Sequence, residues 1–316
     1  MQKIIKMIET TSKVAILSHI DEDADALGSS LAMLKMLKQM GKDAVFYVDK
    51  PVEKRLTFLS DDYVIYDNTQ ESFELVICLD SGDLSRLGNR VSIFNNSQKS
   101  ICIDHHYTNI GYCDENVIDG NMSSTSEMVY NLLCEMGANI TSEMAKFLYC
   151  GIMGDTGCLK YSCASPGTAL VISKLMEYDF DHADVCRRIF DTDPIELVKL
   201  RGYIMNNLES YFDGKVTLAW ADEDVLDRFN VSERDTGNIV NIPRGVEGTQ
   251  VAAFIKKTPE KTKISLRSNG KYNVGEIAQK LGGGGHEMAA GITVGTISVD
   301  EAKEKLLEAI GEVIDG

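Results

Sequence analysis

Four carboxylates follow closely behind a histidine in the stretch His19-Ile20-Asp21-Glu22-Asp23-Ala24-Asp25. Because like charges this close repel one another, several of these groups would have raised pKa values unless they fanned out into water or a cation held them ionised. Taken alone, the stretch therefore indicates either a cation site or a solvated acidic loop with an incidental histidine.

Three further apolar runs also end in acids or histidines. ELVICL leads to Asp80, SICI leads to Asp104-His105-His106, and FLYCGIMG leads to Asp155. In an open α/β sheet the carboxyl ends of the parallel strands meet at one edge, so residues that are distant in the sequence converge there. The set expected to converge is His19, Asp23, Asp25, Asp80 and His105, with Asp155 supplied by a helix end nearby.

These residue types favour particular metals. Hard oxygen ligands mixed with imidazole and without thiolate suit manganese or magnesium, and the histidines favour manganese. Six ligands are more than one ion with open positions would use, so the pattern predicts two ions about 3.5–4 Å apart, with Asp80 as the best candidate for a bridging carboxylate. Such a pair is suited to displacement at phosphorus, because it activates water and stabilises the charge that develops as an ester breaks.

A second candidate site is the glycine run that ends in His286. Four consecutive glycines, of which Gly283, Gly284 and Gly285 precede the histidine, would expose backbone N–H groups to a ligand. A glycine turn with a surface histidine is the alternative for this run alone. Arg267 and Ser268 lie just upstream, and arginine is the preferred bidentate partner of phosphate, so the combination indicates a pocket for the non-reacting part of a nucleotide.

The elements that must position these residues can be predicted from apolar periodicity. A short strand over 13–18 and a helix over 25–40 are followed by apolar runs that read as the strands of a parallel sheet covered on both faces: 44–48, 63–66, 74–80 and 99–104. From about 123 to 210 the pattern is helical. Its predicted N-caps are Ser124 with Glu127 as a capping box, Ser165 before Pro166, and Asp193 before Pro194.

The rest of the chain predicts a second, smaller α/β domain. A hairpin around Asp213-Gly214, two strands (TQVAAFIKK and TKISLRS) and two helices (VGEIAQKL and the last 18 residues) are expected there. We therefore predict a catalytic domain over 1–192, a linker helix over 193–210 and a substrate-binding domain over 211–316. The active site is expected in the cleft between the domains.

Composition narrows the class of protein. The net charge of −16 over 316 residues argues against a protein that coats duplex nucleic acid, and no stretch has the roughly 18 apolar residues that a membrane span needs. Eight cysteines without a Cys-x-x-Cys pair are typical of buried thiols in a reducing compartment. Without an apparent signal peptide, these features predict a cytoplasmic protein.

The motifs together resemble one family along nearly the whole chain. The segments that carry the resemblance are His19-x-x-x-Asp23-x-Asp25-ALGS, CLDSGDLSRLG, IDHHYTN, SSTSE, GIMGDTG and SLRS…GGGGHEMAAG. They look like the DHH phosphoesterases with a DHH-associated C-terminal domain. Two departures stand out: Glu22 stands where the family commonly has proline, and Asn273 stands where an aspartate commonly follows the SLRS strand.

The resemblance implies a role for each matched residue. It implies that His19, Asp23, Asp25, Asp80, His105 and Asp155 are manganese ligands, that His106 contacts the scissile phosphate with Asp104 and Asp80 as further catalytic residues, and that Arg267, Ser268, Gly283, Gly284, Gly285 and His286 hold the substrate.

The function expected from this resemblance is a two-manganese phosphoesterase, with magnesium as the second possible ion. Its expected substrates are short oligoribonucleotides and 3′-phosphoadenosine-5′-phosphate (pAp), and a homodimer is possible. A phosphodiesterase for cyclic di-AMP or for pApA is the first alternative. A non-catalytic nucleotide-binding module is the second alternative, and the presence of all six ligands argues against it.

Overall fold

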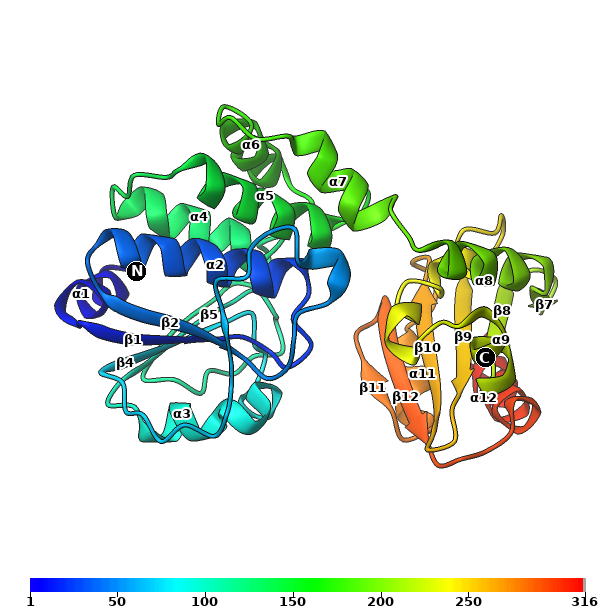
Figure 1. Cartoon of the computed structure of the whole chain (residues 1–316). Helices are drawn as coiled ribbons and strands as arrows, with labels where there is room; N and C mark the ends of the chain where they lie inside the picture. Colours follow the sequence, from blue (N-terminus) through cyan, green and yellow to red (C-terminus); the bar gives the residue numbers. More distant parts are fainter. Residues whose placement is uncertain (315–316) are drawn as a thin grey trace. The chain divides into compact units, whose positions relative to one another are not determined.

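The computed structural model describes residues 1–314, apart from the side chain of Arg234 (Figure 1). Its first half is built on a six-stranded sheet in the order β3-β2-β1-β4-β5-β6, and every neighbouring pair is parallel. The strands are β1 (Lys13–Leu17), β2 (Asp43–Val48), β3 (Val64–Ile65), β4 (Leu75–Leu79), β5 (Ser100–Asp104) and β6 (Glu115–Ile118). The predicted parallel sheet is confirmed.

Helices cover both faces of this sheet because its buried strands are apolar on both sides. Along β1, Val14 and Ile16 pack into the core that also holds Leu27 of α2, whereas Ala15 and Leu17 pack on the opposite side with Ile93 of α3. The helices are α1 (Gln2–Thr10), α2 (Ala24–Gln39), α3 (Val91–Asn96), α4 (Thr125–Glu135), α5 (Ser142–Thr156), α6 (Pro166–Leu175) and α7 (His182–Phe190), with 3-10 turns η1 (Lys54–Leu56) and η2 (Leu84–Arg90).

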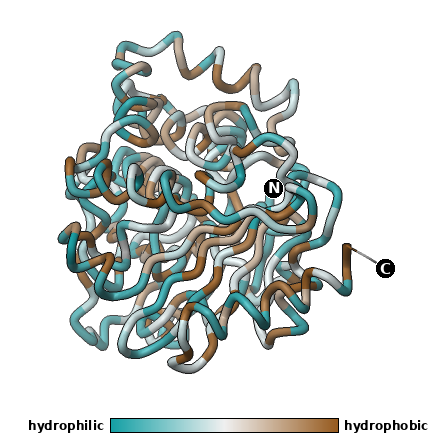
Figure 2. The backbone as a smooth tube through the Cα atoms, turned by 90° about the vertical axis from the view of Figure 1, so that its right-hand side faces the viewer, coloured by the Kyte–Doolittle hydropathy of each residue, from teal (hydrophilic) through white to brown (hydrophobic). Residues whose placement is uncertain are grey.

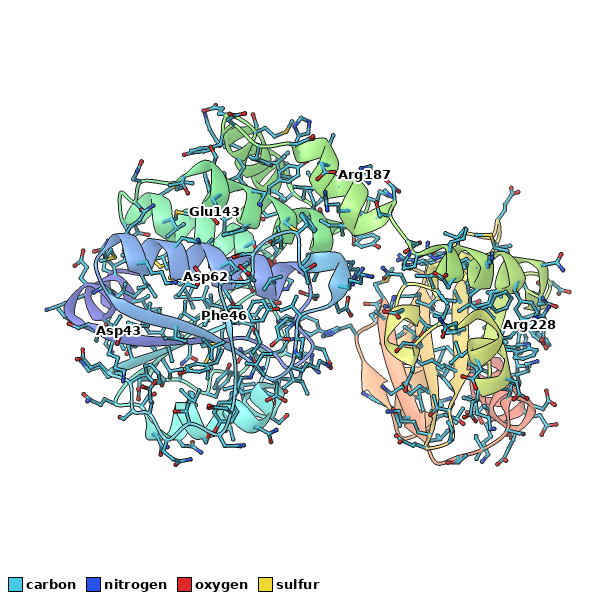
Figure 3. The ribbon with its side chains drawn as sticks, in the orientation of Figure 1. Asp43, Phe46, Asp62, Glu143, Arg187 and Arg228 are labelled. Carbon is cyan, nitrogen blue, oxygen red and sulfur yellow. The ribbon has the colours of Figure 1, made fainter. Side chains whose placement is uncertain are left out.

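Apolar residues recur along the whole backbone. Figure 2 shows hydrophobic stretches along the backbone alternating with hydrophilic ones, as elements that bury one face require. Phe46, labelled in Figure 3, is 1% exposed on β2 and belongs to the larger of the two cores around the sheet. Burying such apolar surface is the main force that holds the layers together.

The predicted helix caps have different outcomes. Ser165 forms a complete capping box with Thr168 ahead of Pro166, as the spacing predicts in outline. Ser124 caps α4 by accepting a hydrogen bond from the backbone N–H of Glu127, but the Glu127 carboxylate does not return the bond and accepts instead from Ser123.

The predicted cap at Asp193 is wrong. Helix α8 (Ile195–Asn206) has Pro194 as its N-cap residue, and no side chain caps it. Asp193 forms an ion pair with Arg201 instead, with 3.0 Å between its Oδ2 and the arginine Nη1. Because that carboxylate lies one residue outside the cap position, it interacts with the second turn of the helix rather than with its first N–H groups.

The second half forms a mixed sheet in the order β11-β12-β10-β9-β8-β7, in which only β8 and β9 are parallel. The strands are β7 (Glu209–Tyr211), β8 (Val216–Ala221), β9 (Val251–Lys257), β10 (Thr262–Ser268), β11 (Gly284–Gly285) and β12 (Ala289–Val294). The predicted hairpin turns at Asp213 and Gly214, which both have positive φ. A smaller α/β domain is therefore confirmed.

Helices also lie on both faces of this second sheet. The helices α11 (Val274–Lys280) and α12 (Val299–Ile314) pack on one face. Helix α8 packs on the other face through Leu197, Leu200 and Ile204, together with α9 (Glu223–Phe229) and α10 (Asn241–Arg244). The 3-10 turn η3 (Glu233–Thr236) lies between α9 and α10 in the chain. The chain divides into two units, Met1–Thr192 and Asp193–Gly316, and α8 belongs to the second. Among the described helices, none has the length and apolar character to span a bilayer.

Candidate metal centre

The strand order of the first unit places three functional loops side by side. His19 follows β1, Asp80 follows β4 and His105 follows β5, and these three strands are neighbours in the sheet. The chain order reverses between β1 and β4, which is the type of switch point where ligands bind in open α/β sheets. Asp80 has a φ of 54°, a left-handed conformation that non-glycine residues rarely adopt and that often marks a functional site.

Three groups of possible ligand atoms meet at this edge of the sheet. Within each group the atoms lie within 4.8 Å of one another, and the groups are His19–Asp23–Asp80, Asp80–His105–His106 and Asp25–His105–Asp155. Asp80 is common to the first two groups and His105 is common to the last two. The structure therefore brings together all six residues that the sequence indicates as metal ligands.

Asp80 presents its two carboxylate oxygens to different neighbours. Its Oδ2 is 3.5 Å from His19 Nε2, and its Oδ1 is 3.6 Å from His105 Nε2 and accepts a hydrogen bond from Thr125 Oγ1 at 3.1 Å. Asp80 is 2% exposed. A carboxylate that faces a different ligand group with each oxygen has the arrangement that a bridge between two cations requires.

The spacing of the ligand atoms suits a common ion. His19 Nε2 is 3.8 Å from Asp23 Oδ1, and His105 Nε2 is 3.1 Å from Asp155 Oδ2. Neighbouring ligand atoms on an octahedral ion with bonds of about 2.1 Å are about 3 Å apart. Small movements would therefore let the two atoms of each pair bind the same cation. The contacts of His19 with the carboxylates of Asp23 and Asp80 are made by its Nε2. Its buried Nδ1 has no hydrogen-bond partner among the described residues.

Helix N-termini hold the two aspartates of the first acidic loop. Asp23 caps α2, because its Oδ1 accepts from the backbone N–H groups of Asp25 and Ala26 at 3.0 and 3.1 Å. The fully buried Asp25 accepts from the backbone N–H groups of Thr125 and Ser126, at the start of α4, at 2.7 and 2.8 Å. The partial positive charge at a helix N-terminus stabilises such carboxylates.

Close packing around Asp25 depends on a glycine in α5. A Cβ at Gly151 would lie 2.0 Å from Ser126 Oγ and 2.8 Å from Asp25 Oδ1. The glycine therefore allows α5, which carries Asp155, to approach α2 and α4 closely enough for Asp25 and Asp155 to face the same group.

The pKa values of this cluster reflect the crowding of charge. Burial lowers the pKa of His19, but hydrogen bonds and charge interactions with Asp23 and Asp80 outweigh it and raise the value to about 10. Burial also raises the pKa of Asp155 to about 6, and the charges of Asp23 and Asp80 add to the effect. The pKa of Asp25 is raised by burial and by the charges of Asp80 and Asp155. A divalent cation would offset the crowding of negative charge that these shifts reflect.

His106 is oriented by a neighbouring acid. Its Nδ1 is 2.7 Å from Asp104 Oδ1, and the other oxygen of Asp104 accepts from Asn109 Nδ2, also at 2.7 Å. The hydrogen bond with Asp104 raises the pKa of His106 despite partial burial. A bond at Nδ1 leaves Nε2 as the ring nitrogen that faces away from Asp104.

Several residues of the site have no functional role in the sequence interpretation, in which Glu127 is only the partner of Ser124 in a predicted capping box. Thr125 and Ser126 hold Asp80 and Asp25, and Asn109 holds Asp104. Glu127 accepts from Ser123 and, at 3.0 Å, from Thr168 Oγ1. The only signal for them was their position inside the SSTSE and IDHHYTN segments.

The second unit places Arg267 and the glycine run on nearby strands, but Ser268 is fully buried and its side chain lies on the opposite face of β10 from that of Arg267. Arg267 and Ser268 end β10, and Arg267 is paired with Ala289 of β12. The next residues of β12 pair with β11, Ala290 with Gly285 and Gly291 with Gly284. A Cβ at Gly285 would lie 2.5 Å from the Cα of Ala290, so this position requires glycine.

The expectation that the glycine run exposes its N–H groups is wrong for part of the run. The N–H groups of Gly282 and Gly283 donate to Gln279 and Ala278, and the N–H of His286 donates to Ala289. The physical reason is that the run closes α11 and then forms the short edge strand β11 rather than an open nest.

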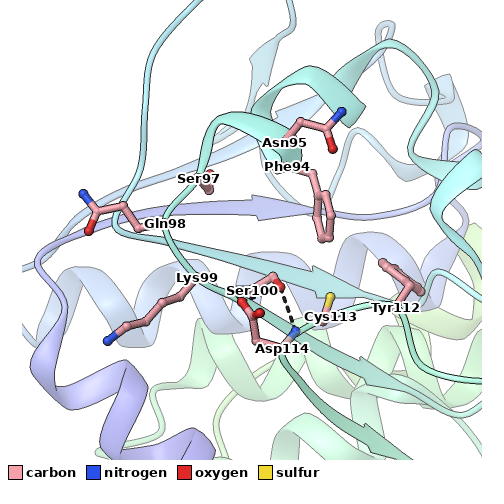
Figure 4. A pocket seen from close by; sticks show the side chains of 9 residues that line it. All are labelled: Phe94, Asn95, Ser97, Gln98, Lys99, Ser100, Tyr112, Cys113 and Asp114. Atoms are coloured by element: carbon pink, nitrogen blue, oxygen red, sulfur yellow. Dashed lines mark hydrogen bonds between the residues drawn. The ribbon is translucent and has the colours of Figure 1, made fainter.

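A cavity of about 370 Å³ lies elsewhere in the first unit (Figure 4). Phe94, Tyr112 and Lys99 line it, and Asp114 within it accepts hydrogen bonds from the N–H and the hydroxyl of Ser100. Ser100 begins β5 whereas Asp104 ends it, so the cavity lies toward the opposite edge of the sheet from the metal cluster. It is therefore separate from the candidate centre.

Comparison with known proteins agrees with this arrangement. Residues 13–152 match the model of the DHH family, N-terminal domain, and residues 213–316 match the DHHA1 domain. The chain is 33% identical to the bifunctional oligoribonuclease and PAP phosphatase NrnA of Thermus thermophilus, over 98% of this chain and 92% of that one. It is 27% identical to the protein of the same name from Bacillus subtilis, over 97% and 96% of the two chains.

A solved structure shares the whole fold. An exopolyphosphatase-related protein from Bacteroides fragilis is 29% identical and superposes with a TM-score of 0.93 over 98% of this chain and 95% of that one. His19, Asp23, Asp25, Asp80, Asp104, His105 and His106 lie within the segment that matches the DHH model, and Asp155 lies three residues beyond its end. The SLRS and GGGGH segments lie within the DHHA1 match. The chain therefore belongs to the DHH family and carries a C-terminal DHHA1 domain.

Proposed function

We propose that this protein is a manganese-dependent phosphoesterase that hydrolyses short oligoribonucleotides to mononucleotides and pAp to AMP. The observation that carries the proposal is the position of Asp80, whose two oxygens face different groups of possible metal ligands. The names of the NrnA relatives from Thermus thermophilus and Bacillus subtilis support the choice of substrates.

Two of the ligand groups described above would each hold one ion. His19, Asp23 and Asp80 would hold one ion. Asp25, His105 and Asp155 would hold the other, together with Asp80, whose Oδ1 lies 3.6 Å from His105 Nε2. When bound, such ions acidify a water molecule and offset the charge of the phosphoryl oxygens. The mixture of imidazole and carboxylate favours manganese over magnesium, and the sites would remain open toward substrate because each group supplies fewer protein ligands than six.

In the proposed mechanism His106 contacts the substrate, and Asp104 orients His106. Asp104 is fully buried, accepts at His106 Nδ1, and favours the protonated imidazole. His106 is about one-third exposed, so its Nε2–H can donate to a phosphoryl oxygen of the substrate. The hydrogen bond from Asn109 keeps Asp104 in the orientation that this role requires.

The second unit would bind the part of the nucleotide that does not react. Arg267 would contact a phosphate, with Ser268, Gly283, Gly284, Gly285 and His286 around it. A positively charged side chain at the binding site is needed because the protein as a whole has a charge of −16 and repels polyanions at long range. Short oligomers present few phosphates and are therefore compatible with an acidic protein.

The proposal is tested by comparing substrates on one preparation of the protein with Mn²⁺. We expect turnover of pAp and of RNA oligomers of about two to five nucleotides, with much slower turnover of a long RNA and of cyclic di-AMP. Preferred cleavage of cyclic di-AMP, or of pApA without activity on pAp, would favour the phosphodiesterase alternative. Tight binding without turnover of any of these compounds would indicate a non-catalytic module.

The proposed role of Arg267 predicts a change in substrate affinity. Arg267→Ala is expected to raise KM for pAp by about tenfold or more while kcat changes by less than about threefold, because the lost bidentate contact is remote from the reacting atoms. Arg228→Ala is the control: this exposed arginine of α9, labelled in Figure 3, lies over Tyr203 and Phe229 in the same unit. An unchanged KM in Arg267→Ala would remove this residue from the proposed substrate site.

A further inference from the structure

A buried arginine contacts the acidic loop of the metal centre from outside. Arg90, at the end of η2, is 0% exposed, and all three of its guanidinium nitrogens donate hydrogen bonds, Nε to the carbonyl of Leu87 at 3.3 Å. Nη1 donates to Glu22 Oε1 at 3.1 Å and to the carbonyl of Tyr47 at 2.7 Å, and Nη2 donates to the carbonyl of Ser18 at 3.1 Å. Complete burial of a guanidinium is unfavourable unless its donors are satisfied, so this arrangement is unusual and specific.

Two of the groups that accept hydrogen bonds from Arg90, in Ser18 and Glu22, lie on either side of His19 in the sequence. Ser18 directly precedes His19, and Glu22 directly precedes Asp23. Glu22 is 4% exposed, so its carboxylate is withdrawn from water toward Arg90. One rigid guanidinium therefore ties both ends of the segment that leads from His19 to Asp23.

Two backbone features bring the segment of Arg90 against this loop. The N–H of Ile20 donates to the carbonyl of Arg86 at 2.9 Å. Gly88 has a φ of 58°, and a Cβ at that position would lie 2.3 Å from Ile20 Cγ2. The glycine thus permits a close approach that places Arg90 within reach of Ser18 and Glu22.

We propose that Arg90 and Glu22 are positioning residues that hold His19 and Asp23 in the geometry that binds the metal. The inference rests on the proposed metal centre. It also accounts for the departure at Glu22, since the related proteins that the motifs resemble commonly have proline there: a proline would restrict the backbone covalently, whereas here a buried ion pair restrains the loop. Groups that orient metal ligands without touching the metal typically contribute strongly to metal affinity.

The effect of charge and the loss of positioning predict different Mn²⁺ affinities for two substitutions of Arg90, to Gln and to Lys. Arg90→Gln removes a positive charge near the carboxylates, so electrostatics alone would tighten cation binding, whereas loss of positioning would weaken it. Glu22→Gln removes a negative charge, and both effects would weaken binding. Arg90→Lys keeps the charge but not the planar fork, so positioning predicts weaker binding for this variant too.

The experiment is a titration of the metal-free full-length protein with Mn²⁺, in which electron paramagnetic resonance measures the free ion. We expect the Mn²⁺ dissociation constant to rise about 10–100-fold in Arg90→Gln and Glu22→Gln, and to rise in Arg90→Lys. The melting temperature of each metal-free variant is measured in parallel. Ile8→Ala, a core substitution on α1, is the control that lowers stability without touching the loop.

The outcomes separate this inference from the proposed function. Wild-type affinity for Mn²⁺ in Arg90→Lys and Glu22→Gln, or tighter binding in Arg90→Gln, overturns the positioning role while leaving the metal centre intact. If Arg90→Gln does not fold, the other two variants decide the question. A similar loss of Mn²⁺ affinity in Ile8→Ala would show that global stability alone is responsible and would also overturn the role. A wild-type protein that binds no Mn²⁺ overturns both proposals.

Discussion

Replacing Asp80 with alanine is expected to reduce kcat for pAp hydrolysis by about three orders of magnitude or more, because groups that stabilise developing charge at the reacting centre have effects of this size. The carboxylate is buried at the end of β4, and its two oxygens lie 3.5 Å from His19 and 3.6 Å from His105. Its removal deletes the group that both proposed ions share. No neighbouring carboxylate in the three ligand groups contacts both of these histidines.

The measurement is steady-state hydrolysis of pAp by purified variant and wild-type protein at saturating Mn²⁺. Circular dichroism and the melting temperature of the metal-free proteins show whether the fold is retained. Asp62→Ala is a suitable control, because that aspartate pairs with Lys35 and Lys38 and belongs to none of the candidate ligand groups. Hydrolysis by Asp80→Ala at the wild-type rate would mean that the assignment of two metals is wrong.

The buried strands of the first sheet were predictable because they are apolar on both faces. The runs VICL and ICI have no polar residue that could face solvent, and this distinguishes the central strands of a parallel sheet from amphipathic elements. The edge strand β6 (Glu115–Ile118) was not predicted. Its residues are partly exposed and partly polar, so pairing with β5 through the backbone is its main determinant.

The meeting of the acids and histidines was predictable from the topology. Asp80 and His105 follow neighbouring strands, so the parallel sheet alone brings them to one edge. The contacts that hold each side chain were not predictable in the same way. Asp25 accepts from Thr125 and Ser126 about 100 residues later in the chain, and this pairing depends on how α2 packs against α4.

Arg90 illustrates the limit of residue type as a signal. An arginine in a polar stretch such as Gly88-Asn89-Arg90 is normally interpreted as an exposed charge, since arginine is rarely buried. Only the fold shows that its guanidinium lies under the acidic loop with Glu22 as its partner. The glycine run before His286 shows the opposite error: its composition favours an open nest, but pairing with Gly291 and Ala290 uses Gly284 and Gly285 in a strand.

Removal of metal is expected to have the second large effect. Exhaustive chelation should abolish hydrolysis of pAp, since the proposed mechanism obtains its activated water from bound cations. Mn²⁺ should restore activity better than Ca²⁺, because His19 and His105 offer imidazole nitrogen, which manganese accepts and calcium disfavours. The assay compares the chelated protein before and after each ion is added back.

The most direct test of the whole account is to count bound manganese on the same chelated and reloaded protein while its activity is measured. The account predicts about two Mn²⁺ ions per chain at saturation, magnetically coupled as expected for ions about 3.5–4 Å apart, with activity returning as the second ion binds. Full hydrolysis of pAp by protein shown to contain no metal, or saturation with a single ion at full activity, would contradict it.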